Sequence, residues 1–237
     1  MKKLRNVLIS LVATISLTSV AYAGSFGLGV TGSYTKVDAS GTETTPAVTG
    51  AAPAAAESNS TSVDNNVFTG SIYAEYSLDD ASWAGAGNGI TFGAEYTPGS
   101  ADVSDKIHSR TDVTTDANEA VQDDGTRTAA AEVDKYRNFY LEIPVYGSIY
   151  VKAGMSQIDV TTKETTTITT SGTYGNKTLD GTNLGIGFKG ITSNNIVWKF
   201  AYEQTDFDTL NLTSTTSNTI KADLDTKEVA LSIGYRF

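Results

Sequence analysis

The stretch Val229-Ala-Leu-Ser-Ile-Gly-Tyr-Arg-Phe237 at the end of the chain alternates strictly between apolar and small or polar residues. A period of two is typical of a β-strand whose two faces meet different surroundings. The apolar positions are Val229, Leu231, Ile233, Tyr235 and Phe237. Because an aromatic residue ends this face, we expect something apolar to cover the strand along its whole length.

Seven earlier segments repeat this alternation, and none has the 3.6-residue period of an amphipathic helix. They are residues 26–36, 68–78, 90–97, 137–145, 149–158, 184–189 and 197–205. Long and short connections alternate along the chain. The long ones are 38–66, 98–135, 160–182 and 206–224, and the short ones are 79–88, 145–148 and 190–195. This order predicts an all-β fold, an eight-stranded antiparallel up-and-down β-barrel with its long loops at one end.

The long connections differ in composition. Residues 38–66 are rich in Ala, Thr, Pro, Ser and Gly, which indicates a flexible loop. Thr dominates residues 161–170, and spaced Leu and Ile residues occur between 210 and 224. Because Thr favours strands, we expect the last two hairpins to continue beyond the barrel as protruding β-ribbons.

The composition of the polar face indicates which side of the barrel points outward. A soluble lipocalin-like barrel would have its apolar face inside and a charged outer surface. Here the polar face is mostly Gly, Ser, Thr and Ala, and its few charges are nearly balanced, as expected of an enclosed interior where unpaired charges are costly. These charges are Glu75, Glu95, Glu142, Glu203, Glu228, Lys152, Lys189, Lys199 and Arg236. We therefore expect the apolar face to lie outside.

Aromatic residues of the apolar face gather in two bands. One lies near the long loops, at Tyr34, Phe68, Tyr96, Phe139 and Tyr202, and the other near the short turns, at Phe26, Tyr76, Phe92, Trp198, Tyr235 and Phe237. Two aromatic girdles around an aliphatic band are typical of a barrel that crosses a bilayer. The pattern predicts a transmembrane β-barrel, and with eight strands its interior should be filled by side chains.

The first 23 residues have the features of a secretory signal peptide. Lys2, Lys3 and Arg5 precede an apolar run, and Ala21-Tyr-Ala23 is a typical cleavage site, so we expect cleavage after Ala23 and a single barrel domain over residues 24–237. The remaining chain has 14 basic and 27 acidic residues, a formal charge of −13, which argues against nucleic acid as a partner. It has no cysteine, which excludes disulfides and thiolate metal sites.

Few residues are candidates for chemistry. His108, the only histidine, lies in the second long connection, where a polar loop favours a solvated surface histidine over a catalytic one. The same connection holds nine acidic residues without the spacing of a calcium loop, so we interpret it as a solvated acidic surface. We predict no enzyme activity and no catalytic, metal-binding or cofactor-binding residues.

The signal peptide, the eight alternating strands, the loop order and the terminal Tyr235-Arg236-Phe237 resemble the small outer-membrane barrels of Gram-negative bacteria, of the OmpA, OmpX and opacity type. The resemblance covers residues 24–237 and rests on pattern, not on a catalytic motif. It implies an outer-membrane location, contact with membrane lipid and lipopolysaccharide, and recognition of the C-terminal Phe237 by the barrel-assembly machinery. In contrast to OmpA, we expect no periplasmic domain after the last strand, which ends at Phe237.

Three hypotheses about function remain open. The first is a monomeric, non-enzymatic outer-membrane barrel whose long acidic loops serve envelope integrity, adhesion or binding of an extracellular protein or ligand. The second is a narrow porin-like channel for ions or small solutes. The third is a soluble exported barrel that binds a ligand.

Overall fold

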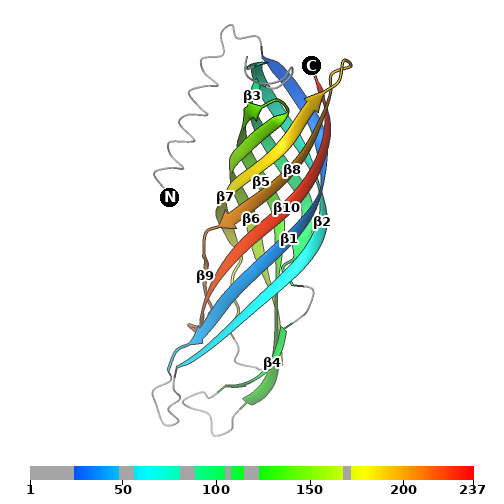
Figure 1. The fold of residues 1–237 in the computed structure, drawn as a ribbon. Helices are drawn as coiled ribbons and strands as arrows, with labels where there is room; N and C mark the ends of the chain where they lie inside the picture. The colour runs from blue at the N-terminus through cyan, green and yellow to red at the C-terminus, as the bar shows by residue number, and fades with distance from the viewer. Residues whose placement is uncertain (1–23, 48–55, 81–88, 105–107, 115–122, 168–171) are drawn as a thin grey trace.

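The computed structural model describes residues 24–47, 56–80, 89–104, 108–114, 123–167 and 172–237 (Figure 1). The predicted signal peptide, residues 1–23, lies outside the described residues. The described strands are β1 (Ser25–Thr45), β2 (Glu57–Asp80), β3 (Gly89–Asp102), β4 (His108–Thr114), β5 (Asp123–Tyr146), β6 (Ile149–Thr166), β7 (Lys177–Ile191), β8 (Ile196–Phe207), β9 (Leu210–Thr213) and β10 (Thr219–Arg236). No helix in these residues is long and apolar enough to span a membrane.

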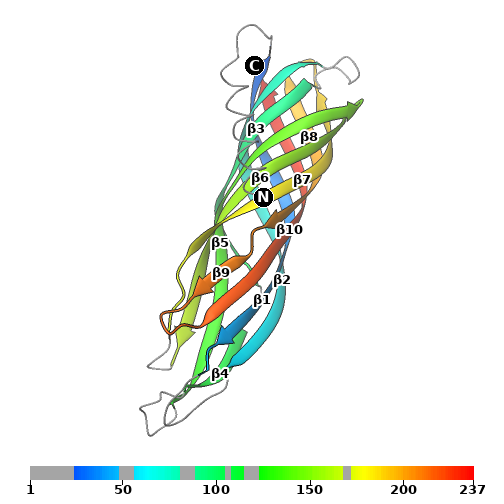
Figure 2. The same cartoon turned by 90° about the vertical axis from the view of Figure 1, so that its left-hand side faces the viewer.

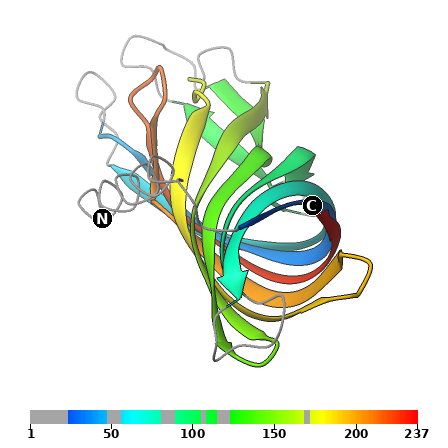
Figure 3. The same cartoon turned by 90° about the horizontal axis from the view of Figure 1, so that it is seen from above.

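Eight of the strands form a closed antiparallel barrel, as the alternation predicts. The order around the ring is β1-β2-β3-β5-β6-β7-β8-β10, and β10 pairs with β1 to close it. The closing register places Leu28 opposite Tyr235 and Tyr34 opposite Val229. β4 pairs only with β5, and β9 pairs with β10 where β8 has ended. Figure 3 shows the ring seen from above.

The strands are much longer than the sequence alternation indicates. β1 and β2 stay paired from Phe26 and Tyr76 up to Thr45 and Glu57, through most of the range predicted as a flexible loop. β5 begins at Asp123, within the second predicted loop. The prediction that these residues form loops, flexible in the first connection, is therefore wrong. Strand pairing does extend in the last two hairpins, but their residues continue the barrel wall and do not form separate ribbons (Figure 2).

The long strands change their sidedness part-way along their length. On β1 the outward residues are apolar up to Tyr34 and polar from Lys36, whereas the inward residues are polar up to Thr35 and apolar from Val37 to Gly41. On β6 the change comes between Ser156 and Ile158. We call the part with apolar outward residues the belt half and the part beyond it the distal half. The distal half lies at the lower end of Figure 1.

This inversion has two causes, a shift in the sequence pattern on β1 and a β-bulge on β5. On β1 the apolar residues move from even to odd positions while the pleat continues unchanged. On β5 the apolar residues keep odd positions, and an irregularity between Asp134 and Arg137 moves them to the other face. Lys135, with φ of 50°, is the extra residue at this bulge, so Val133 and Tyr136 both face inward. A bulge is the usual way to re-aim the side chains of a strand.

Candidate functional site

The interior of the belt half is filled by a network of ion pairs. Lys199 Nζ donates to Glu142 Oε1 at 2.8 Å and also to Glu75, and Lys189 Nζ lies 2.5 Å from Glu142 Oε2. Lys152 Nζ donates to Glu203 at 2.8 Å. Glu142 is only 1% exposed. The interior charge set predicted from the sequence is thus confirmed for these residues.

Aromatic rings close the remaining space around this network. The Tyr140 hydroxyl donates to Glu75 at 2.7 Å, and Lys152 lies 4.1 Å from the centroid of the Tyr140 ring. Lys199 lies 4.6 Å from the centroid of the Tyr73 ring. The cavity left among these side chains has about 10 Å³, little more than the room that one water molecule needs. The described interior therefore offers no open path for a solute.

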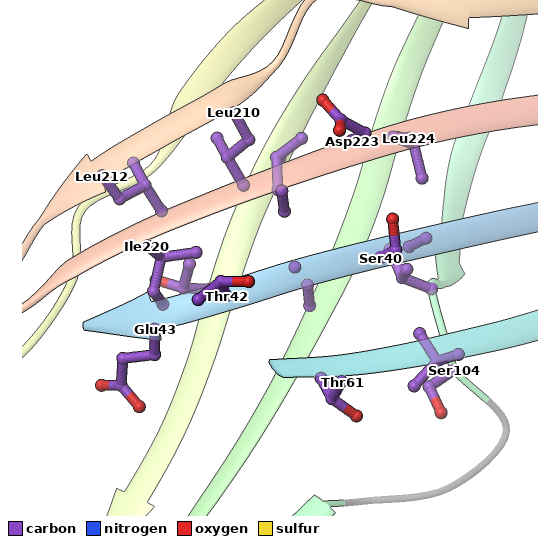
Figure 4. A pocket seen from close by; sticks show the side chains of 18 of the residues that line it. Ser40, Thr42, Glu43, Thr61, Ser104, Leu210, Leu212, Ile220, Asp223 and Leu224 are labelled. Atoms are coloured by element: carbon purple, nitrogen blue, oxygen red, sulfur yellow. The ribbon is translucent and has the colours of Figure 1, made fainter. Parts of the chain in front are cut away.

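The distal half contains a cavity with a volume of about 390 Å³. Its wall is mostly apolar, and Figure 4 shows Leu210 and Leu212 of β9 close to Ile220 and Leu224 of β10. Val160 and Leu179 of β6 and β7 belong to the same buried cluster. Pockets of about 300–1,000 Å³ with apolar walls are typical of small-molecule sites. This cavity, which we call the distal compartment, is the candidate functional site.

The distal compartment is also lined by polar side chains, and the ionised ones are acidic. Among the described residues, Glu43, Glu164 and Asp223 line it, and no lysine or arginine does. The Tyr174 hydroxyl donates to Glu43 at 2.7 Å, and the Thr209 hydroxyl donates to Asp223 at 2.7 Å. A second cavity of about 200 Å³ shares Val133 and Leu224 with the compartment and lies next to the belt. The two cavities therefore lie next to each other at Val133 and Leu224.

The wall of the distal half is incomplete between β2 and β3. Their ladder starts near Asp80 and Gly89 and ends at Ile72 and Tyr96, whereas β2 itself continues to Glu57. Farther along the two strands, Asn65 Nδ2 donates to the Asp102 carbonyl at 2.8 Å. We call the interval between these two points the side opening. The second cavity is lined by residues from both of its edges, among them Phe68 and Gly70 of β2 and Ala101 of β3.

The sequence explains why the ladder stops there. Pro98 has no N–H to donate to a neighbouring strand. Gly99, with φ of 92°, adopts a backbone conformation that side chains disfavour. The two residues form an irregularity between Thr97 and Ser100 in the pairing of β3 with β5. β3 therefore keeps its partner on one side and loses it on the other.

The outer surface of the distal half carries a row of aspartates. Asp38 of β1 lies opposite Asp64 of β2 and Asp225 of β10, and Asp225 lies opposite Asp206 of β8. Lys36 Nζ donates to Asp38 at 2.5 Å. Burial raises the pKa of Asp225 above its ordinary value, and the charge of Asp206 adds to this effect. Within the described residues, no group of three or more His, Cys, Asp or Glu side chains is placed to hold a metal ion.

Other acidic residues of the second predicted loop lie on strands and have basic partners. Glu132 pairs with Lys163, whose hydrogen bond lowers the pKa of Glu132. Asp159, on the neighbouring β6, accepts a hydrogen bond from Thr178, which together with Arg137 lowers its pKa. His108 begins β4, but its side chain lies outside the described residues. Its role as a solvated surface histidine stays a prediction.

The sequence predicted the interior charges but not the distal compartment. Its lining residues, such as Ala39, Val63 and Val160, fall in ranges predicted to be loops. The alternation continues beyond Tyr34, but the apolar residues move from even to odd positions, and this shift could have revealed the lining. The small or apolar residues Val37, Ala39 and Gly41 alternate there with the polar residues Lys36, Asp38 and Ser40.

No protein-family model and no curated protein matches the chain. Among solved structures, the chain is similar to Ail, the attachment invasion locus protein of Yersinia pestis, with 12% identity, 90% of this chain and 99% of that chain covered, and a TM-score of 0.38. It is also similar to the outer membrane protease OmpT of Escherichia coli, with 6% identity, 93% of this chain and 99% of that chain covered, and a TM-score of 0.45. The comparison with Neisserial surface protein A gives 11% identity, covers 86% of this chain and 97% of that chain, and has a TM-score of 0.31. These values are too low to transfer the role of any residue or any ligand.

Proposed function

We propose that the chain is an integral β-barrel of the Gram-negative outer membrane, with a closed interior and a distal half that projects from the cell as a surface-interaction structure. The observation that carries this proposal is the belt of exposed apolar side chains around the first half of the barrel. Phe68 is 84% exposed and Phe139 65% exposed, and they sit on different strands at the end of the belt. A soluble protein rarely exposes a continuous apolar surface of this size.

The height of the belt fits a bilayer. On β1 the belt runs from Phe26 to Tyr34, which at ~3.3 Å per residue is roughly 30 Å of strand. A tilt of ~40° reduces this to about 23 Å across the membrane, close to the ~25 Å apolar band of outer-membrane barrels. β1 has 21 residues, so about half of it lies beyond the belt, where its outward residues are polar. A closed barrel also satisfies every backbone hydrogen bond within lipid.

The filled interior favours the closed barrel over the narrow channel. Lys152, Lys189 and Lys199 are paired with buried carboxylates, and moving them aside would leave charges without partners. We therefore expect no steady conductance when the folded protein is inserted into planar bilayers. Large, steady and voltage-insensitive steps would contradict the closed barrel and support the channel.

The remaining parts of the proposal concern export and partners. Residues 1–23 would direct export and be removed after Ala23, and the alternating strand that ends at Phe237 would be recognised by the barrel-assembly machinery. The belt would contact lipid and lipopolysaccharide. The distal half, with its acidic surface and with β4 paired on one edge only, would present a strand edge that another protein can extend. We propose a monomeric protein without enzyme activity for this role.

Cell fractionation combined with heat-modifiability on a gel tests the membrane placement. A folded barrel should appear in the outer-membrane fraction and migrate differently before and after boiling. Mass spectrometry of the mature protein should show Gly24 as its first residue. Recovery of the exported protein in a detergent-free soluble fraction would contradict the proposal and support a soluble barrel. Proteinase added to whole cells should cut the distal half and spare the belt.

A further inference from the structure

We propose that the distal compartment binds a single-chain apolar molecule with a neutral or cationic head group, and that this ligand reaches it from the membrane through the side opening between β2 and β3. The inference deepens the proposed function and rests on the membrane placement of the belt. It adds a ligand class and a route to a structure so far described as a surface projection.

The shape and lining of the compartment fit one hydrocarbon chain. The two neighbouring cavities of about 390 Å³ and about 200 Å³ extend from the belt boundary into the distal half, and they share Val133 and Leu224. Buried apolar side chains form their walls, at Val37, Val160, Leu179, Leu210, Leu212 and Leu224. Transfer of a chain from water into such a space gains about 0.8 kcal/mol for each CH₂ group buried. A polar ligand would not gain this energy.

The charges around the compartment select the head group. Within the part of the chain that the structure describes, the charged groups that line the two cavities are five acids, Glu43, Glu164, Asp223, Asp134 and Glu228, and one base, Lys135. Lys135 is already paired with Asp134 and Asp159. An anionic head group would meet like charges, which cost several kcal/mol in a partly desolvated site. A neutral or cationic head group meets no such penalty.

The position of the side opening explains the route. Its belt-side edge, at Ile72 and Tyr96, belongs to the apolar outward face of the belt, and Phe68 flanks it on β2. The opening therefore begins at the level where the proposed membrane ends. Residues 66–71 of β2 pair with β1 but not with β3, and this stretch is roughly 20 Å long at ~3.4 Å per residue. This length admits a chain but not a folded domain, and Asn65 and Asp102 close its far end.

Photo-crosslinking in phosphatidylcholine vesicles tests the ligand class. Three probes share one alkyl chain with a diazirine near its end, and differ only in a hydroxyl, a trimethylammonium or a carboxylate head group. We expect the first two to label peptides that contain Val160, Leu212 or Ile220 at least about tenfold more than the carboxylate does. Equal labelling by all three probes, or labelling confined to outward belt residues, would overturn the proposal.

Two matched variants test the site. Ala222→Trp fills the compartment from β10, whereas Lys221→Trp adds the same side chain to the outer surface of the same strand. We expect the first to abolish labelling of the compartment and the second to leave it unchanged. Heat-modifiable migration shows whether each variant has folded, and the labelling map of the unaltered protein stands independently of both. Retained labelling in folded Ala222→Trp would overturn the site.

A third variant tests the route. Ala101→Trp narrows the side opening, and Leu231→Trp places a Trp on the belt away from it. With the probe supplied in the vesicle lipid, we expect Ala101→Trp to slow labelling several-fold and Leu231→Trp to leave its rate unchanged. Equal rates would overturn the route. A protein that remains soluble and never inserts would overturn the proposed function itself, whereas an inserted protein without compartment labelling would overturn only this inference.

Discussion

At the scale of single residues, Glu142 holds the closed interior together. It is almost fully buried, and its two oxygens receive Lys199 at 2.8 Å and Lys189 at 2.5 Å. The alternation of β5 was enough to predict that Glu142 faces inward with the other eight charges. Which charge would pair with which could not be predicted, because pairing across the barrel depends on the tilt and stagger of the strands.

Glu142→Gln should destabilise the barrel strongly, because it leaves two buried lysines short of a negative partner. We expect a loss of about 3–5 kcal/mol in the free energy of unfolding, measured by urea titration in detergent micelles. Asp159→Asn is the control, since Asp159 lies on the polar outer surface of the distal half with Arg137. It should cost at most about 1 kcal/mol. Similar small losses for both variants would contradict the importance of the interior network.

Asp225→Asn should stabilise the distal half at pH 7. The pKa of Asp225 in the folded state lies above its ordinary value of 3.8, so its charge destabilises the folded state at neutral pH. This penalty fades as the pH falls through the raised pKa and vanishes below 3.8. We expect a gain of about 0.2–1 kcal/mol at pH 7, as measured for like charges on neighbouring strands.

The same comparison at pH 3 provides the internal check, because Asp225 is then protonated and the substitution should have no effect. Glu57→Gln makes the same change in net charge at the end of β2, away from the aspartate row. A gain from Asp225→Asn that is equal at both pH values, or that Glu57→Gln reproduces, would contradict repulsion along the row.

At the scale of the elements, β3 shows how a short sequence opens the wall. Pro98 and Gly99 were predicted to lie in a long loop, and they instead form a bulge within a strand. Existence and order of the eight strands were predictable, because apolar alternation on the belt is strong. Their lengths were not, because outward residues such as Ser40, Thr42 and Ser62 on a water-facing strand have the composition of a loop.

Gly99→Ala should destabilise the protein through its backbone alone. A Cβ at Gly99 would meet no atom within 4 Å, and neither would one at Gly32 on β1. Of these two glycines, only Gly99 has a positive φ, at 92°. A side chain in this backbone conformation destabilises the folded state by about 1–2 kcal/mol. We expect a loss of this size for Gly99→Ala in chemical denaturation, and a change within about 0.5 kcal/mol for Gly32→Ala. Equal effects would contradict a strained turn at Gly99.

At the scale of the whole molecule, the barrel consists of two halves with opposite sidedness. The belt half has a polar core and an apolar surface, and the distal half has an apolar core and a polar surface. The fold class and the outward direction of the belt could be predicted from eight repeats of one pattern. The distal half could not be predicted in this way. The pattern used for prediction places the apolar residues on the outer face, whereas the strands of the distal half have their apolar residues on the inner face.

The boundary between the halves can be located with a single tryptophan. The sequence has two, Trp83 and Trp198, so Trp83→Phe leaves only Trp198, which lies on the outer face of the belt. We expect brominated lipids to quench its fluorescence. In a second variant with Trp83→Phe, Trp198→Phe and Lys227→Trp, the remaining tryptophan lies two residues beyond Val229, in the distal half. Strong quenching there by bromines near the bilayer centre would place the boundary elsewhere.

The bulge at Lys135 separates two parts of β5 in which odd-numbered residues have opposite directions. Val133 faces inward on one side of the bulge, and Phe139 faces outward on the other. Deletion of Lys135 would leave Tyr136 alone opposite Ile158 of β6, so the two strands would pair residue by residue and every side chain of β5 would keep its present face. Insertion of one residue in a regular part of β5 would instead need a second bulge to keep both parts facing as they do. β5 should therefore tolerate the loss of residue 135 more readily than the gain of a residue elsewhere.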